Sequence, residues 1–304
     1  MNHEEKIAAK KSKKEQKAAL KRDKKEGRRI KTIPPMSKIE PFIMKQRVDA
    51  TNYISGTVDI GPCEEYIRRK REEGLEYFSM MHVFLAAFVR AFARYPAMNR
   101  FIRGQRLYSR NCIEVMITVK MEMTVESPDT VVKMILPRDA TAEDVYRIVN
   151  EEITKARQPE NSDFEALTKI LDVMPRFVMR AFIRLLKFMD YYGWLPRRLT
   201  KLSPFHGSFA ITSMGSLGIP PIYHHLYDFG NIPIFFAFGV KYRKNELQKD
   251  GTVRTLHCVD YRFTCDERIA DGYTYATALK YMRGIYRHPE VLDNPPDRIY
   301  DDIP

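Results

Sequence analysis

Cysteine is scarce in this 304-residue sequence, with four residues and no Cys-x-x-Cys pair. Cys63, Cys112, Cys258 and Cys265 offer no metal-ligand spacing, so we expect unpaired thiols and no metal site. Few cysteines without a disulfide framework are typical of a reducing compartment, and we expect a cytoplasmic location.

Long uninterrupted apolar runs are also missing. The first 20 residues contain no apolar core of a secretory signal, which agrees with a cytoplasmic location. The longest apolar region, residues 177–195, is interrupted by four charged residues: Arg180, Arg184, Lys187 and Asp190. Charges at this density exclude a membrane-spanning helix.

Acidic residues are outnumbered, and the net charge is +12. The excess is concentrated in residues 1–31, which hold 13 Lys and Arg against 5 Asp and Glu. This segment has no apolar face, so we expect a basic tail that is helical or disordered. The alternative is a weak contact with an anionic membrane or RNA through residues 1–31. The lack of aromatic side chains among these lysines favours a solvated tail.

The rest of the chain alternates helical and strand patterns. Thr32-Ile33-Pro34-Pro35 marks its start, and residues 79–95 are apolar on nearly all sides, which predicts a buried helix that ends before Pro96. Further helices are predicted over 63–74, 141–157 and 273–286, and strands over 58–60, 113–119, 131–136, 207–215, 234–239 and 252–263. This order predicts one α/β domain over residues 32–294 with one large sheet, followed by a tail over 295–304.

Residues 164–205 form a further apolar helical stretch, broken at Pro175. Arg176, Arg180, Arg184 and Lys187 recur at helical spacing and form one basic stripe. The stretch is either a helix packed on the body with this stripe in water, an apolar wall for a greasy substrate, or an interfacial membrane helix.

Four stretches carry a resemblance to a known family: MHVFLAAFVRAFARYPAMN (81–99), GSFAITSMG (207–215), IPIFFAFG (232–239) and DERIADG (266–272). In this order they resemble the catalytic domain of the dihydrolipoyl acyltransferases of 2-oxoacid dehydrogenase complexes, which shares its fold with chloramphenicol acetyltransferase. The last is similar to the family's Asp-His-Arg-x-x-Asp-Gly. The resemblance covers residues 36–294 and implies an α+β two-layer sandwich with helices packed on a mixed central sheet.

Three features depart from the family. The sequence shows no lipoyl domain and no subunit-binding domain, so we do not expect a working component of a dehydrogenase complex. We interpret residues 164–205 as an insertion before the strand at Gly207. Glu267 stands where the family has its catalytic histidine.

In this family the histidine removes the proton of a thiol of coenzyme A or dihydrolipoamide, and a serine or threonine hydroxyl stabilises the oxyanion. The resemblance places Thr212 at the hydroxyl and Glu267 at the base. It places Asp271 at a second aspartate that pairs with a buried arginine, for which Arg47 is the candidate.

The resemblance also implies the ligands and the assembly. Acyl-CoA is expected as a substrate, with no permanently bound cofactor. A homotrimer is expected, with the active site at the subunit interface. Side chains expected near the substrate are Ser213, Gly215, Tyr223 and Arg268.

Glutamate is a weaker base than histidine for a thiol. A thiol near pKa 8.5 lies about 4 units above an ordinary glutamate and about 2 above histidine, a difference worth roughly 3 kcal/mol. Burial that raises the pKa of a glutamate to about 6–7 recovers most of this difference.

A histidine elsewhere could serve as the base instead. His224 and His225 lie in a loop that lines the family's active-site channel, and His257 precedes the turn. His82 is expected to be a core histidine.

Two functions therefore remain open. One is a CoA-dependent acyltransferase with an altered base, for which the apolar insertion hints at a long-chain acyl group. The alternative is a catalytically inactive family member that serves as an oligomeric binding scaffold.

Overall fold

A six-stranded mixed sheet lies at the centre of the computed structural model, which describes residues 26–120, 129–156 and 174–304. Most of the basic segment and residues 164–173 of the insertion lie outside the described residues. The strand order is β2-β9-β8-β7-β5-β6. The strands are β2 (Thr51–Asp59), β5 (Ile113–Lys120), β6 (Asp129–Leu136), β7 (Phe209–Ser213), β8 (Ile234–Leu247) and β9 (Val253–Asp266). β7 pairs in parallel with β5 and β8, and the other neighbours are antiparallel.

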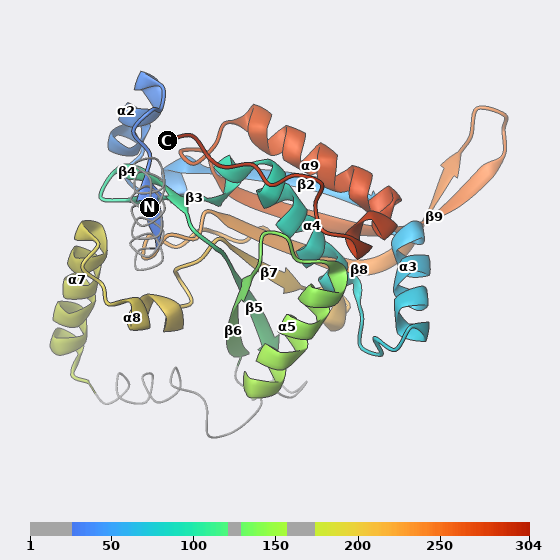
Figure 1. The fold of residues 1–304 in the computed structure, drawn as a ribbon, viewed down its shortest axis with the longest axis horizontal. Coiled ribbons are helices and arrows are strands. Elements are labelled where there is room, and N and C mark those ends of the chain that lie inside the picture. The colour runs from blue at the N-terminus through green and yellow to red at the C-terminus, as the bar shows by residue number, and fades with distance from the viewer. Residues whose placement is uncertain (1–25, 121–128, 157–173) are drawn as a thin grey trace, which may run out of the picture.

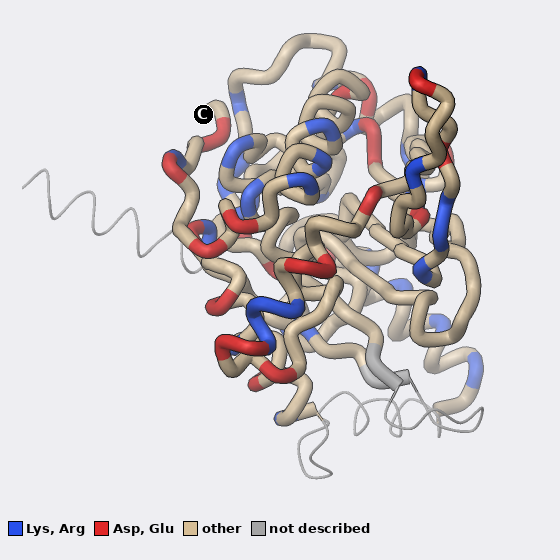
Figure 2. Tube along the Cα trace, turned by 90° about the vertical axis from the view of Figure 1, so that its right-hand side faces the viewer, with Lys and Arg blue, Asp and Glu red and all other residues tan. Residues whose placement is uncertain are grey.

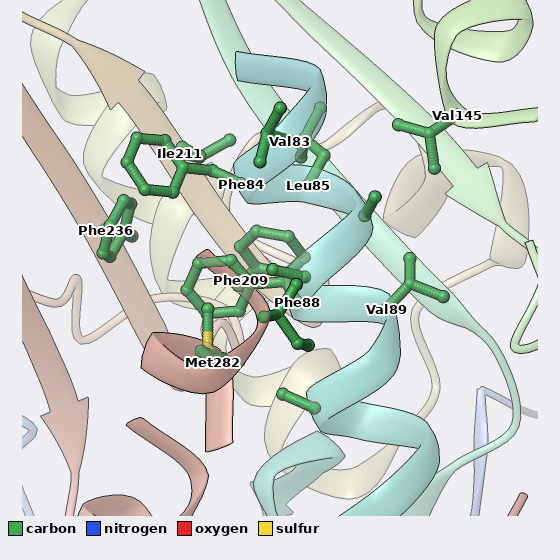
Figure 3. Close-up of a cluster of buried hydrophobic side chains, with 14 of the residues drawn as sticks. Val83, Phe84, Leu85, Phe88, Val89, Val145, Phe209, Ile211, Phe236 and Met282 are labelled. Carbon is green, nitrogen blue, oxygen red and sulfur yellow. The ribbon is translucent and has the colours of Figure 1, made fainter. Parts of the chain in front are cut away.

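Helices cover one face of this sheet (Figure 1). They are α3 (Gly61–Glu72), α4 (Met80–Arg94), α5 (Ala142–Ala156) and α9 (Gly272–Arg287). α4 is buried along almost its whole length, as its apolar composition predicts. Phe84 and Phe88 point from α4 toward Phe209 and Phe236 of the sheet (Figure 3), and the rings of Phe88 and Phe209 stack at 4.5 Å. Each buried phenylalanine contributes about 1.5–3 kcal/mol to this layer.

A smaller sheet lies at one end of the molecule. It consists of β1 (Gly27–Arg29), β4 (Arg106–Arg110) and β3 (Arg100–Arg103). The helices at this end are α2 (Pro35–Ile43), α7 (Arg176–Tyr192) and α8 (Arg197–Leu202) (Figure 1). On the side with α3, positive and negative side chains are interspersed (Figure 2).

The C-terminal residues pack against the body. The amide of Tyr300 donates to the carbonyl of Ala93 at 2.8 Å. The carboxylate of Asp302 binds Arg100 at 2.6 and 2.8 Å.

In the described part of the chain, no helix combines the length and apolarity that crossing a bilayer requires.

His82 is a core histidine, as predicted. Its ring stacks on Phe78 with centroids 5.3 Å apart, and its Nδ1 accepts the backbone N–H of Ser79 at 3.0 Å. The side chain thereby completes the cap of α4. Burial lowers the pKa of His82 to about 4.

This shift predicts a pH dependence of stability. Unfolded chains bind the His82 proton below pH 6.5, whereas the folded protein binds it only near pH 4. Stability is therefore complete above pH 6.5 and falls by up to about 3 kcal/mol as the pH drops to 4. Urea unfolding at pH 7 and pH 4.5 should show a smaller loss in His82→Gln than in the native protein. The exposed His288→Gln variant should keep the full loss, and an unchanged loss in His82→Gln would contradict the account.

Candidate active site

The turn after β9 is held by a buried ion pair. Arg268 folds back so that its Nε and Nη2 donate to the two carboxylate oxygens of Asp266, at 2.8 and 2.7 Å. Its Nη1 donates to the carbonyl of Met44 at 2.7 Å. Asp266 is 0% exposed and Arg268 is 5% exposed. The guanidinium of Arg268 is thus part of the frame of the turn, and its contact with the substrate stays a prediction.

Glu267 lies between these two residues and is only half-buried. Its carboxylate accepts the side-chain amide of Asn52 at 2.8 Å, and its backbone N–H donates to Ala50. Within the described residues, no lysine, arginine or histidine forms an ion pair with it. Partial burial of Glu40 and, to a smaller extent, the negative charge of Glu267 raise the pKa of Glu40. The position predicted for the base thus holds a carboxylate that no cation among the described residues neutralises.

Asp271 begins α9. Its carboxylate is exposed and accepts the backbone N–H of Thr274 at 2.8 Å. Hydrogen bonding to the side chain and then to the backbone of Thr274 lowers the pKa of Asp271. Arg47 instead donates to the carbonyls of Ile232 and Gly230 and is buried. The expected pair between Asp271 and Arg47 is therefore wrong. Asp271 acts as a helix cap because an aspartate just before a helix satisfies a free N–H group of the first turn.

The end of β7 presents the predicted hydroxyl. Thr212 is 8% exposed, and its hydroxyl makes no hydrogen bond with any other described residue. Ser213 points to the opposite face of the sheet, because side chains alternate along a strand. Gly215 lies so close to the carbonyl of Gly239 that a Cβ atom there would stand 2.8 Å from it. Only glycine allows this close approach of the two backbones.

Ser213 and Gly215 line a cavity of about 980 Å³. Its apolar wall includes Met80, Met81 and Phe238, and its basic groups are Arg68, Arg71 and Lys241. Met80 and Met81 also form the first turn of α4, whose free N–H groups favour an anion. The lining also includes Glu64 and Glu72, and Lys241 forms an ion pair with Glu64 at 2.7 Å. The cavity therefore combines an apolar surface with three basic and two acidic groups.

These basic residues were not predicted as site residues. The signal that could have located them is the run Ile67-Arg68-Arg69-Lys70-Arg71 on a surface helix. The run alone does not identify the cavity, because Arg69 and Lys70 of the same run form ion pairs with Asp293.

The loop over residues 219–233 covers the face of the sheet opposite the helices. Tyr223 packs edge-on against Tyr53 at 5.7 Å, and the guanidinium of Arg262 lies 4.9 Å from its ring centre. His224 stacks on Phe235 with centroids 3.7 Å apart. These contacts fix Tyr223 and His224 over the sheet.

His224 has the tautomer of a base. Its Nδ1 lies 2.9 Å from the carbonyl of His225, and because a carbonyl only accepts, Nδ1 carries the proton. Burial lowers the pKa of His224, which keeps the ring neutral and leaves Nε2 as an acceptor. His225 is exposed and packs on Tyr227, while His257 is paired with Glu64 at 2.6 Å.

The strand register decides which candidates one chain brings together. Thr212 lies beside Ala237, and Ala237 lies beside Arg262. Glu267 follows five residues later, so it lies roughly 20 Å from Thr212. Phe235, on which the ring of His224 stacks, lies one strand and two residues away from Thr212. This is a separation of roughly 8 Å. A single chain therefore brings His224 near Thr212 and leaves Glu267 remote.

Across residues 26–120, 129–156 and 174–304, no cluster of three or more His, Cys, Asp or Glu side chains could hold a metal ion.

Several solved structures with a similar fold are named as acetyltransferases. The chain is similar to a probable dihydrolipoamide acetyltransferase from Listeria monocytogenes (TM-score 0.54, 15% identity, 89% of this chain and 99% of that one). It is also similar to a chloramphenicol acetyltransferase (0.51, 13%, 86% and 99%). The dihydrolipoamide acetyltransferase of Azotobacter vinelandii gives a TM-score of 0.51 at 11% identity, over 86% of this chain and 93% of that one.

These likenesses confirm the predicted fold: this chain has the chloramphenicol acetyltransferase-like architecture of a mixed sheet covered by helices. No family model and no curated protein sequence matches the chain.

Proposed function

We propose that this protein is a CoA-dependent acyltransferase whose active site is assembled between copies of the chain. The observation that carries the proposal is the hydroxyl of Thr212 near the end of β7, which makes no hydrogen bond with any other described residue. The following residues Ser213 and Gly215 line the large cavity on the other face of the sheet, where an apolar wall suits an acyl chain and the side chains of Arg68 and Arg71 suit the phosphates of coenzyme A. The fold is that of the acyltransferases described above.

The reaction would transfer the acyl group from the thioester of acyl-CoA to the acceptor. A base removes the proton of the acceptor thiol or hydroxyl, and the freed electron pair attacks the carbonyl carbon of the acyl-CoA. The Thr212 hydroxyl donates to the oxyanion that forms. The intermediate collapses by breaking the carbon–sulfur bond, and the departing CoA thiolate takes back the proton held by the base.

We assign the role of the base to Glu267 of a neighbouring copy. The separation of roughly 20 Å between Thr212 and Glu267 within one chain supports this assignment, because only a second copy could join the two groups. A homotrimer, as in the resembled family, would close the ring with three equal interfaces. His224 of the same chain is the second candidate base, since its neutral Nε2 lies near Thr212.

The other candidate function is an inactive oligomeric scaffold. The observation in its favour is that the carboxylate of Glu267 is held by Asn52 and has no histidine partner among the described residues. We place either function in the cytoplasm, in keeping with four free cysteines.

A panel of acyl-CoAs tests the proposal, with release of the CoA thiol as the readout. We expect turnover that depends on acyl-chain length, and KM about tenfold higher in Arg68→Glu because a negative charge replaces a positive one at the cavity rim. This effect should shrink as salt is added.

Arg283→Glu is the matched control, since Arg283 is an exposed arginine on α9 outside the cavity lining. Its KM should equal that of the native protein. A protein that neither binds nor cleaves any acyl-CoA would overturn the proposal and leave the scaffold.

A further inference from the structure

The helix α7 exposes its apolar side chains to solvent. None of its 17 residues is buried. At the helical spacing, Phe177, Leu185, Phe188 and Tyr192 fall on one face, and all four are exposed, Phe177 by 76%. Trp194, which follows the helix and is 62% exposed, packs its ring against Tyr192. A stripe of this size rarely faces water in a soluble monomer.

A basic stripe runs beside the apolar one. Arg176, Arg180, Arg184 and Lys187 are all exposed on the neighbouring flank of α7. Residues 174–203 contain seven lysines and arginines and one acidic residue, Asp190. That aspartate does not neutralise the stripe, because it faces the body and binds His206 at 3.2 Å.

The C-terminal end of α7 is anchored while the apolar stripe is left free. His206 is fully buried and joins Asp190 of α7 to the hydroxyl of Ser203, which lies 2.7 Å from its Nδ1. Gly104 of the β3–β4 turn would clash with the carbonyl of Tyr191 if it carried a Cβ atom. The body therefore fixes the direction of α7 through its last turn.

A second amphipathic helix is attached to the same turn. Gln105 accepts the hydroxyl of Tyr191 at 2.8 Å and donates to the carbonyl of Pro41 in α2 at 3.4 Å. Pro41 is the buried side of α2, while the opposite side exposes an apolar stripe of Met36, Ile39, Phe42 and Ile43. Both helices lie at one end of the molecule (Figure 1). The β3–β4 turn thus contacts both α7 and α2, and the apolar stripes of both helices are exposed.

We propose that this end of the molecule, the exposed faces of α7 and α2, docks onto the surface of a membrane that contains anionic lipids. Aromatic and aliphatic side chains flanked by arginine and lysine fit the boundary between headgroups and acyl chains. A second copy seated on the same face would bring two basic stripes together, which like-charge repulsion opposes. RNA would satisfy the arginines but leave Leu185 and Phe188 without an apolar partner.

The test uses the full chain and vesicles of phosphatidylcholine with or without phosphatidylglycerol. We expect co-sedimentation with the anionic vesicles and little with the neutral ones. The variant Phe177→Ser/Leu185→Ser/Phe188→Ser keeps every positive charge, including those of the N-terminal segment, and should bind about tenfold more weakly. Arg180→Gln/Arg184→Gln should bind more weakly at low salt.

Leu247→Ser/Val253→Ser is the matched control. Both side chains are exposed and apolar, but they lie on the β8–β9 hairpin at the other end of the molecule (Figure 1). This control should bind like the native protein, and all variants should keep the native unfolding temperature because the changed residues are exposed. Vesicle binding that survives the triple substitution overturns the proposal. So does a triple variant that changes only the oligomeric state or only RNA binding.

Discussion

Replacing Asp266 with alanine is expected to destabilise the protein by about 3–5 kcal/mol, the cost of leaving a buried charge without its partner. Both oxygens of Asp266 accept from Arg268, and Asp266 is 0% exposed. The guanidinium of Arg268 would keep only its bond to Met44. Urea unfolding at neutral pH measures the loss directly.

Asp271→Ala is the control within the same turn. Its carboxylate is exposed and caps α9 through Thr274, so its loss should cost about 1 kcal/mol. Equal losses in the two variants would show that the buried pair does not hold the turn.

Glu267→Gln is expected to lower kcat by about 10²–10⁴-fold, the range for loss of a general base. Stability should not change, because a glutamine oxygen still accepts the amide of Asn52. His224→Gln distinguishes the second candidate base: if Glu267 is the base, its turnover should remain near the native rate. A variant Glu267→Gln with native kcat would remove Glu267 from the mechanism.

Much of the fold could be predicted from the sequence because its core elements have strong patterns. The buried helix at 79–95 matches α4 at Met80–Arg94, and the strand sequence at 207–215 contains β7. β2 was predicted only at Val58-Asp59-Ile60, whereas it runs over Thr51–Asp59. It lies at the edge of the sheet and much of it is exposed, so it lacks a regular apolar alternation.

The site was less predictable, because side-chain direction depends on contacts between distant segments. The motifs indicated Thr212 and Glu267 as candidate site residues. It did not show that Arg268 turns inward onto Asp266, since the carbonyl of Met44 that completes this arrangement is remote in sequence. The spacing of α7 predicted its basic stripe, but not that its apolar face would stay in solvent.

The direction of the His224 ring is a further example. The His-His pair was recognised in the sequence, but its tautomer follows from the position of the His225 carbonyl. The stacking of His224 on Phe235 requires the loop to fold over β8. Neither feature has a local sequence signal.

Mixing two inactive variants tests the central proposal, a site shared between copies, most directly. Glu267→Gln and Thr212→Val are each expected to lack turnover, and they are unfolded together and refolded as mixed assemblies. In a cyclic trimer formed at equal amounts, about a quarter of the interfaces pair a native Glu267 with a native Thr212, so about a quarter of the native activity should return. Mixed assemblies that stay inactive, although the native protein turns over, would show that the site does not join Glu267 of one copy to Thr212 of another.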